Sequence, residues 1–346
     1  MTVTEVDRAI TGGVDTHLEM HMVAALDPIG GLLGVETFPA TPAGYRHLLA
    51  WMAAFGTVVK VGVEGTGAYG AGLARFLRRA GVEVIEVDRQ NRQARRSQGK
   101  SDPVDAIEAA RAAQSGRARG LAKTRDGKVE AIRALMVARR SAREVRIKTL
   151  NQIRHLSFTA PDELRARLKG LSPHALAAET AALRPRPDSD TVIFATKTAL
   201  RVLGRRVVAL EEEMAGIDEL LGELVEDVAP GLLAVFGVGV LTAAILLAAA
   251  GDNPERLRSE AAWAHLCGVA PREASSGKVV RHRLDRGGNR HANHALWCIV
   301  ITRMSNEPRT RAYVERRRKE GRSTKEIIRV LKRYVAREVY RHLPRP

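Results

Sequence analysis

Residues 10–120 alternate between short runs rich in β-branched residues and segments with helical spacing, and this alternation restricts the fold more than any other feature. Strands are predicted within residues 12–27, 32–40, 58–67 and 82–88, and helices within 41–56, 68–81 and 100–116. Thr41 is placed to cap the first helix, with Pro42 as its first residue. Gly81 and Gly116 end the other two. Strands alternating with helices are typical of an α/β layer built on a largely parallel sheet.

A second pattern lies in the middle of the chain, where apolar residues recur at alternating spacings of four and three. They are Leu203, Val207, Leu210, Met214, Ile217, Leu221, Leu224 and Val228. Such a seam predicts a coiled coil or a long helical hairpin. A first arm is expected from about Val129 to Leu156, with a weaker seam because arginines interrupt it at positions 139, 143 and 146. The arms could serve helix packing within one chain or dimerisation, and we favour dimerisation.

The chain is strongly basic, with a formal net charge of +17 and a sequence pI of about 10.6. Residues 1–120 hold 14 Lys and Arg against 13 Asp and Glu, whereas the remaining residues hold 42 against 26. A basic excess confined to one part of a chain is typical of nucleic-acid binding. Aromatic residues make up only 4% of the chain, which argues against stacking of unpaired bases as the main binding mode.

Residues 231–251 carry no charged side chain and are numerous enough to span a bilayer. Four glycines interrupt this stretch and acidic residues flank it, so we expect a buried helical core and no membrane span. The N-terminus lacks the apolar segment of a signal peptide, and Cys267 and Cys298 form no CxxC motif. These features predict a cytoplasmic protein.

Four acidic residues form the first candidate site. Asp15 lies in one predicted strand, and Glu64 ends another. Asp102 and Asp105 lie three residues apart on a predicted helix and so share a face. A carboxylate at the end of a hydrophobic strand is costly unless it is paired or binds a metal, and Mg²⁺ relieves such repulsion in phosphoryl transfer. Read alone, Asp102 is instead an N-cap before Pro103, with Asp105 complementing the helix dipole.

A basic segment with two serines, residues 268–296, forms the second candidate site. Ser275 and Ser276 precede a glycine, and the cations that follow them are Lys278, Arg281, Arg283, Arg286 and Arg290. Cations around a serine lower the pKa of its hydroxyl and stabilise the charge that develops as it attacks a phosphodiester. On composition alone, a surface turn whose arginines contact phosphate is the favoured interpretation.

The order and spacing of these motifs resemble the DEDD transposases of the insertion-sequence-110 family. The matching segments are GVDTH (13–17), VEGTGAYG (63–70), KSDPVDA (100–106), FGVGVLTAA (236–244), GVAPREASSGK (268–278) and RGGNRHANHAL (286–296). The resemblance implies a RuvC-like, RNase H-type α/β domain at residues 1–122, a helical coiled-coil spacer at 123–229 and a mainly α-helical transposase domain at 230–346. It also implies a set of site residues: Mg²⁺ bound by Asp15, Glu64, Asp102 and Asp105, and a nucleophile at Ser276, with Ser275 as the alternative.

The resemblance further implies a recombinase that excises an element from double-stranded DNA and inserts it at a target. A structured non-coding bridge RNA would pair with donor and target DNA, so that base pairing selects the sequence. Dimers or tetramers would form composite active sites. Two alternatives stay open, namely a Mg²⁺-dependent junction nuclease that uses only the four acids and an architectural binder without activity. A passive binder has no use for both the acids and the serine, which favours the recombinase.

Overall fold

The computed structural model describes residues 8–87, 101–273, 275, 282–283 and 287–344. The chain forms two compact units, and we describe each by itself. Unit 1 comprises Met1–Gly127 together with Ala250–Arg258, a segment that we call the strap. Unit 2 comprises Lys128–Ala249 and Ser259–Pro344, so the chain enters unit 1 a second time to supply the strap. The division into three domains with boundaries at 122/123 and 229/230 stays a prediction.

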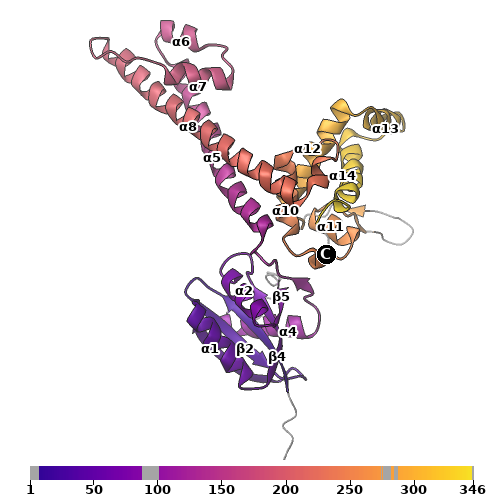
Figure 1. The fold of residues 1–346 in the computed structure, drawn as a ribbon. Helices are drawn as coiled ribbons and strands as arrows, with labels where there is room; N and C mark the ends of the chain where they lie inside the picture. The colour runs from indigo at the N-terminus through magenta and orange to yellow at the C-terminus, as the bar shows by residue number, and fades with distance from the viewer. Residues whose placement is uncertain (1–7, 88–100, 274, 276–281, 284–286, 345–346) are drawn as a thin grey trace, which may run out of the picture. The chain divides into compact units, whose positions relative to one another are not determined.

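A six-stranded sheet forms the centre of unit 1 (Figure 1). Its strands are β1 (Ala9–Thr16), β2 (Met20–Leu26), β3 (Leu32–Pro39), β4 (Thr57–Glu64), β5 (Glu83–Val87) and β6 (Gly120–Leu121), in the order β3-β2-β1-β4-β5-β6. β4 pairs in parallel with β1 and β5, whereas the other three pairings are antiparallel. The expectation of a largely parallel sheet is therefore wrong. Short turns join β1, β2 and β3, and such turns connect only antiparallel neighbours.

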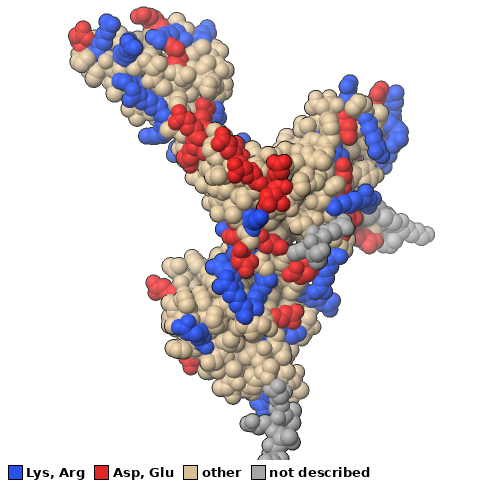
Figure 2. Space-filling view, in the orientation of Figure 1, with Lys and Arg blue, Asp and Glu red and all other residues tan. Residues whose placement is uncertain are grey.

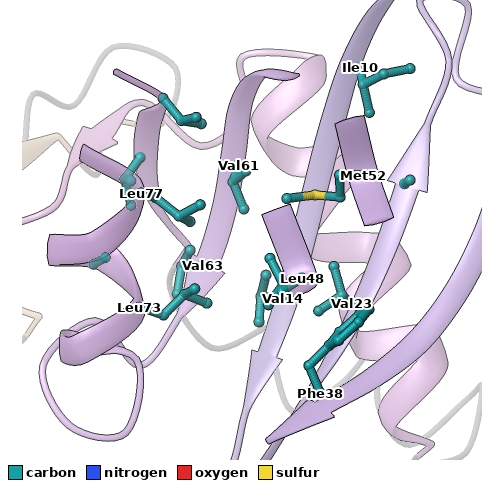
Figure 3. Packing of buried hydrophobic residues seen from close by; sticks show 14 of the residues in the cluster. Ile10, Val14, Val23, Phe38, Leu48, Met52, Val61, Val63, Leu73 and Leu77 are labelled. Carbon is teal, nitrogen blue, oxygen red and sulfur yellow. The ribbon is translucent and has the colours of Figure 1, made fainter. Parts of the chain in front are cut away.

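Helices cover both faces of this sheet. Helices α1 (Pro42–Ala53) and α2 (Ala71–Arg79) lie on one face, where Leu48 and Met52 pack with Leu73 and Leu77 against strand valines (Figure 3). The cap predicted for α1 is confirmed, because the Thr41 hydroxyl accepts a 3.1 Å hydrogen bond from the backbone N–H of the third helical residue.

Helix α4 (Asp102–Gln114) packs on the opposite face, unusually close to the strands. A Cβ built on Gly13 of β1 would lie 2.2 Å from both the Ala106 oxygen and the Ala110 nitrogen. A Cβ on Gly62 of β4 would lie 2.4 Å from the Ala109 oxygen. Since the helix also presents alanines to the sheet, backbone approaches backbone along this face. The absence of side chains on two neighbouring strands fixes where α4 can lie.

Unit 2 begins with a helical hairpin. Its long helices are α5 (Lys128–Phe158) and α8 (Thr191–Val228), and α6 (Asp162–Leu168) and α7 (Pro173–Ala181) lie between them in the chain. The seam predicted at 203–228 lies in α8, where Val207 and Leu221 are fully buried. α5 packs along α8 within the same chain, so a long hairpin, one of the two structures predicted, is what the chain forms.

Ion pairs join the two long helices where the apolar seam is thin. Arg139 forms a two-pronged pair with Asp218, and Arg146 bonds Glu211 with its Nε at 2.7 Å. Two of the arginines that interrupt the predicted first arm therefore face carboxylates of α8. Figure 2 shows acidic side chains gathered along this hairpin. In α8 they are Glu211, Glu212, Glu213, Asp218, Glu219, Glu223, Glu226 and Asp227.

Six further helices complete unit 2. They are α9 (Pro230–Leu233), α10 (Val240–Ala250), α11 (Glu260–Leu266), α12 (Arg290–Asn306), α13 (Pro308–Lys319) and α14 (Thr324–Tyr340). The uncharged stretch at 231–251 yields α10, whose Leu246 and Leu247 are fully buried. Within the described ranges, no helix combines the length and the apolar character needed to cross a membrane.

We expect Gly13→Ala to destabilise unit 1 by about 2 kcal/mol, because the added Cβ overlaps helix backbone that cannot move without shifting α4. Urea denaturation followed by circular dichroism measures this change. Gly216→Ala is the matched control, since nothing lies within 4 Å of a Cβ there. That variant should be about 0.5 kcal/mol more stable, as alanine favours a helix over glycine. Equal stability of the two variants would contradict the close helix–sheet contact.

Candidate active site

Two of the predicted acids end neighbouring parallel strands. Val14 of β1 is in register with Val63 of β4, so Asp15 and Glu64 form the next pair. Alternate residues of a strand share a face, which puts both carboxylates on the face of Gly13 and Gly62, where α4 packs. Adjacent strands lie about 4.8 Å apart. Asp15 is only 7% exposed and Glu64 only 5%, so these acids lie side by side and largely out of water.

The other two predicted acids lie in the first turns of α4. Ser101 is the N-cap residue, and its carbonyl accepts the Asp105 N–H at 3.1 Å. Asp102 is thus the first helical residue, and its interpretation as the N-cap is wrong by one position. Asp105 is buried, whereas the Asp102 side chain is 45% exposed. Because α4 lies across the glycines of β1 and β4, its first turn lies near the strand ends that carry Asp15 and Glu64.

His17 joins this cluster, and the sequence analysis did not single it out. Its Nε2 lies 3.1 Å from Oδ2 of Asp15 and 3.6 Å from Oδ2 of Asp102. One ligand atom from each of these three residues lies within 4.8 Å of the others, a separation suited to a shared metal ion. A signal was present in the sequence, because a residue two positions after Asp15 points to the same face of the strand.

Burial and like charge act together on Asp15. Its pKa is raised above the ordinary aspartate value, first by burial and then by the negative charges of Asp105 and Asp102, while His17 opposes the shift. Two further carboxylates, those of Asp105 and Asp102, therefore lie close enough to Asp15 to act on its charge. Carboxylate oxygens and imidazole nitrogen are common ligands of divalent cations. The cluster is therefore a candidate divalent-metal site.

The strap is linked, through Glu86 of β5, to the turn that follows Glu64. Thr66 is buried and donates a 2.6 Å hydrogen bond from its hydroxyl to Oε1 of Glu86 in β5. Arg256 of the strap lies 3.4 Å from the other oxygen of Glu86 and donates from Nε to the Leu121 carbonyl at 3.0 Å. This chain of contacts links the strap, through two side chains, to a residue two positions from a candidate ligand.

A second strap residue is tied to the backbone of unit 1. Asn253 is 4% exposed, and its amide nitrogen donates to the Ala122 carbonyl at 3.1 Å. The Thr124 N–H donates to the side-chain oxygen Oδ1 of Asn253 at 3.4 Å. The strap thus pairs with backbone groups on both sides of Lys123.

The predicted serine loop lies between two short strands, β7 (Arg272–Glu273) and β8 (His282–Arg283), which pair antiparallel. Ser275 is exposed. Arg290 is the first residue of α12 and is also exposed. Arg283 lies in β8 by its backbone. The other predicted residues of this segment, Ser276, Lys278, Arg281 and Arg286, lie outside the described residues.

Comparison with known proteins decides the family. A family model of IS110-type DEDD transposases matches residues 12–159, and a second, described as the transposase family of IS116, IS110 and IS902, matches residues 230–315. The chain belongs to the IS110 family of transposases. The first match contains all four predicted acids and His17, and the second contains the serine loop and the strap. Both candidate sites of this IS110-family protein therefore lie in segments characteristic of the family.

A curated relative gives a partial match. It is a 43.6 kDa protein of insertion element IS110 from Streptomyces coelicolor, 29% identical over 157 residues. The alignment covers 43% of this chain and 38% of the relative. The chain thus aligns with about two fifths of the length of the curated relative it matches.

We expect Asn253→Ala to destabilise unit 1 by about 2 kcal/mol, because it leaves the Ala122 carbonyl and the Thr124 N–H unpaired in a buried place. Urea denaturation and amide hydrogen exchange around residue 124 measure the loss. Asn306→Ala is the control, since Asn306 is exposed and bonds only within its own helix. A stability change below about 0.5 kcal/mol in both variants would contradict the structural role of the strap.

We expect Asp15→Asn to raise the melting temperature of the metal-free protein. The raised pKa means that the folded state disfavours the charged carboxylate, so metal-free stability should also fall as pH rises through that pKa. Mg²⁺ or Mn²⁺ should stabilise the wild type in a thermal melt and leave Asp15→Asn unchanged.

The matched control for this prediction is Glu83→Gln, an exposed acid-to-amide change in the same unit. It should keep the wild-type response to metal. Equal stabilisation of the wild type and Asp15→Asn by metal would contradict a metal site at this cluster.

Proposed function

We propose that this protein is an active DNA recombinase that cleaves and rejoins strands through a serine nucleophile, assisted by Mg²⁺ at the acidic cluster. The observation that carries the proposal is the burial of Asp15 and Glu64 at adjacent strand ends beside the first turn of α4, within a transposase-family match. A buried cluster of like charges is costly, and a resident cation is the usual reason for its presence. The mixed sheet with helices on both faces also supports the RuvC-like assignment of this region.

The residues present fit a hard divalent cation. Asp15, Glu64, Asp102 and Asp105 supply carboxylate oxygens, the ligands that Mg²⁺ prefers. Burial, and after it the charges of Asp105 and Asp102, raise the pKa of Asp15, and a bound cation would offset both effects. When bound, the ion would polarise the scissile phosphate and stabilise the leaving oxygen. The chain's own part is to fix the carboxylates on two strands and one helix, with His17 bonded to Asp15 so that its carboxylate keeps one orientation.

Ser276 is the proposed nucleophile, and Ser275 is the alternative. The serine Oγ forms a bond to the scissile phosphorus while the bond from phosphorus to the leaving deoxyribose oxygen breaks. The serine proton passes to solvent and the leaving oxygen takes one up. Attack by the hydroxyl of another strand reverses the step and frees the serine, so one ester replaces another. No nucleotide hydrolysis is needed to rejoin the strands.

Partners follow from the charge of the chain and from the family. We propose that Lys278, Arg281, Arg283, Arg286 and Arg290 contact the backbone of double-stranded DNA, both donor ends and target. A bridge RNA would select those sequences by base pairing. Half-buried Leu210, Met214 and Ile217 in α8 leave apolar surface for a second copy, which supports a coiled-coil dimer or tetramer. The protein would act in the bacterial cytoplasm, at the nucleoid.

A second candidate function is a metal-dependent DNA junction nuclease. It is favoured by one observation, namely that Asp15, His17 and Asp102 cluster within unit 1 alone. In that case water attacks the phosphate, and Ser276 has a structural role only.

Covalent trapping separates the two functions. The protein is mixed with candidate guide RNA, Mg²⁺ and labelled DNA carrying element ends, then denatured. We expect label to migrate with wild-type protein, because the serine–phosphate ester survives denaturation. Ser276→Ala removes the nucleophile and Asp15→Ala removes a metal ligand, so both should abolish the adduct.

Ser275→Ala is the matched control in this assay, since it changes the neighbouring hydroxyl and should keep the adduct. An adduct lost in Ser275→Ala and kept in Ser276→Ala would move the nucleophile by one residue. Strand cleavage without an adduct in any sample would overturn the serine mechanism in favour of the nuclease.

A further inference from the structure

We propose that a shallow basic depression on α12 and α14 binds one unpaired nucleobase together with its phosphate. Arg290, Asn293, His294, Trp297 and Lys332 line it, and we call it the tryptophan depression. Its volume is about 430 Å³, within the range of small-ligand sites. The proposal rests on the proposed function in that the ligand is a nucleic-acid strand of the recombination complex.

Helix α12 divides into a buried face and a face that carries the depression. Its inner face consists of Ala292, Ala295, Leu296, Ile299 and Val300, all fully buried. Arg290, His294 and Trp297 follow at spacings of four and three, which puts them on one exposed face. Trp297 lies on the outer face and is 41% exposed. The residues of the inner face hold α12 in place without it, so the indole is available to bind a ligand.

The two rings of the depression stack on each other, and we call this pair the platform. The His294 imidazole lies nearly parallel to the Trp297 indole, at an interplanar angle of 15° and a centroid distance of 5.5 Å. Because the neighbouring imidazole already holds the indole ring, little side-chain conformational entropy is lost when a base stacks on it. Base–aromatic stacking accepts any base, because every base has a π-face.

Among the residues that the structure describes, the cations beside the platform have no anionic partner. Lys332 is half-buried, and its ammonium donates to the side-chain oxygen Oδ1 of Asn293 at 2.8 Å. Asn293 is fixed in that orientation because its amide nitrogen donates to the Cys267 carbonyl, also at 2.8 Å. Neither Lys332 nor Arg290 forms an ion pair with any described residue, and no described acid lines the depression. Burial and the charge of Arg329 lower the pKa of Lys332, a penalty that a bound phosphate would offset.

The combination favours an unpaired strand over a duplex. In a duplex each base already stacks on its neighbours, so an indole cannot reach its face without opening the helix. An aromatic platform beside cations is the arrangement that single-stranded nucleic acid uses. The strand can be DNA opened during recombination or an unpaired part of an RNA, and the two share the same base and phosphate chemistry.

Fluorescence anisotropy of the full-length protein in chelator tests the site without strand cleavage. The probes are fluorescein-labelled twelve-nucleotide oligothymidine, the matching oligouridine and a duplex of equal length. Trp297→Ala should weaken binding of a single strand about tenfold and that of the duplex less than about twofold. Trp297→Phe keeps an aromatic face and should stay within about threefold of wild type. A loss with oligothymidine alone identifies DNA as the source, and a loss with oligouridine alone identifies RNA.

Two matched variants complete the test. Lys332→Ala should lower the slope of log affinity against log salt concentration by the amount that corresponds to about one phosphate contact. Tyr334→Ala removes an exposed aromatic side chain of α14 that lies outside the depression, and it should leave single-strand binding unchanged. Unchanged binding in Trp297→Ala, or equal losses with duplex and single strand, would overturn the proposal. A different molecular mass of Trp297→Ala in analytical sedimentation would also overturn it, because the indole would then lie in a contact between subunits.

This readout is independent of the serine mechanism. If Trp297→Ala forms the covalent adduct and binds single strands as tightly as the wild type, the nucleobase site is refuted and the recombinase proposal stands. If Trp297→Ala weakens single-strand binding but the wild-type protein forms no adduct, the nucleobase site stands and the serine mechanism is refuted.

Discussion

The contact between α4 and the sheet determines most of what the N-terminal region can do. A helix normally lies about one side-chain layer above a sheet, but Gly13 and Gly62 remove that layer and the alanines of α4 fill what is left. The close approach carries the first turn of the helix down to the ends of β1 and β4. Asp15 and Glu64 at the strand ends thereby lie beside the first turn of α4, and burial together with the charges of Asp105 and Asp102 raises the pKa of Asp15.

The local features of this region could be predicted because each depends on a few neighbouring residues. The Thr41 cap follows from such rules, and so does the alternation of strands and helices. The direction of strand pairing could not be predicted in the same way, since it depends on turns that make β1 to β3 antiparallel. Asp15 and Glu64 were predicted from their positions on strands, and Asp102 and Asp105 from their spacing on a helix. His17 was missed because a half-exposed histidine looks like any surface residue without its partners. The strap lies outside sequence reasoning altogether, because nothing in residues 250–258 indicates a partner 131 residues away.

The hairpin shows a different limit of prediction. Arg139 and Arg146 interrupt the apolar seam of the first arm, for which the sequence predicts a weaker seam. In the structure these arginines pair with Asp218 and Glu211, so charge sets the antiparallel register where apolar contact is sparse. Half-buried pairs of this kind contribute more to specificity than to stability. The register of the arms is thereby fixed without consuming the apolar residues in the middle of α8.

The strap also has a consequence for the order in which the protein is made. Residues before 128 leave the ribosome long before Asn253 and Arg256 do, at about 5–20 residues per second. During that interval the backbone around Lys123 and the carboxylate of Glu86 lack their partners from the strap. The acidic region is completed only when more than two thirds of the chain has been translated. A truncated product from an interrupted message would therefore carry the four acids without the strap that pairs with Glu86 and with the backbone beside Lys123.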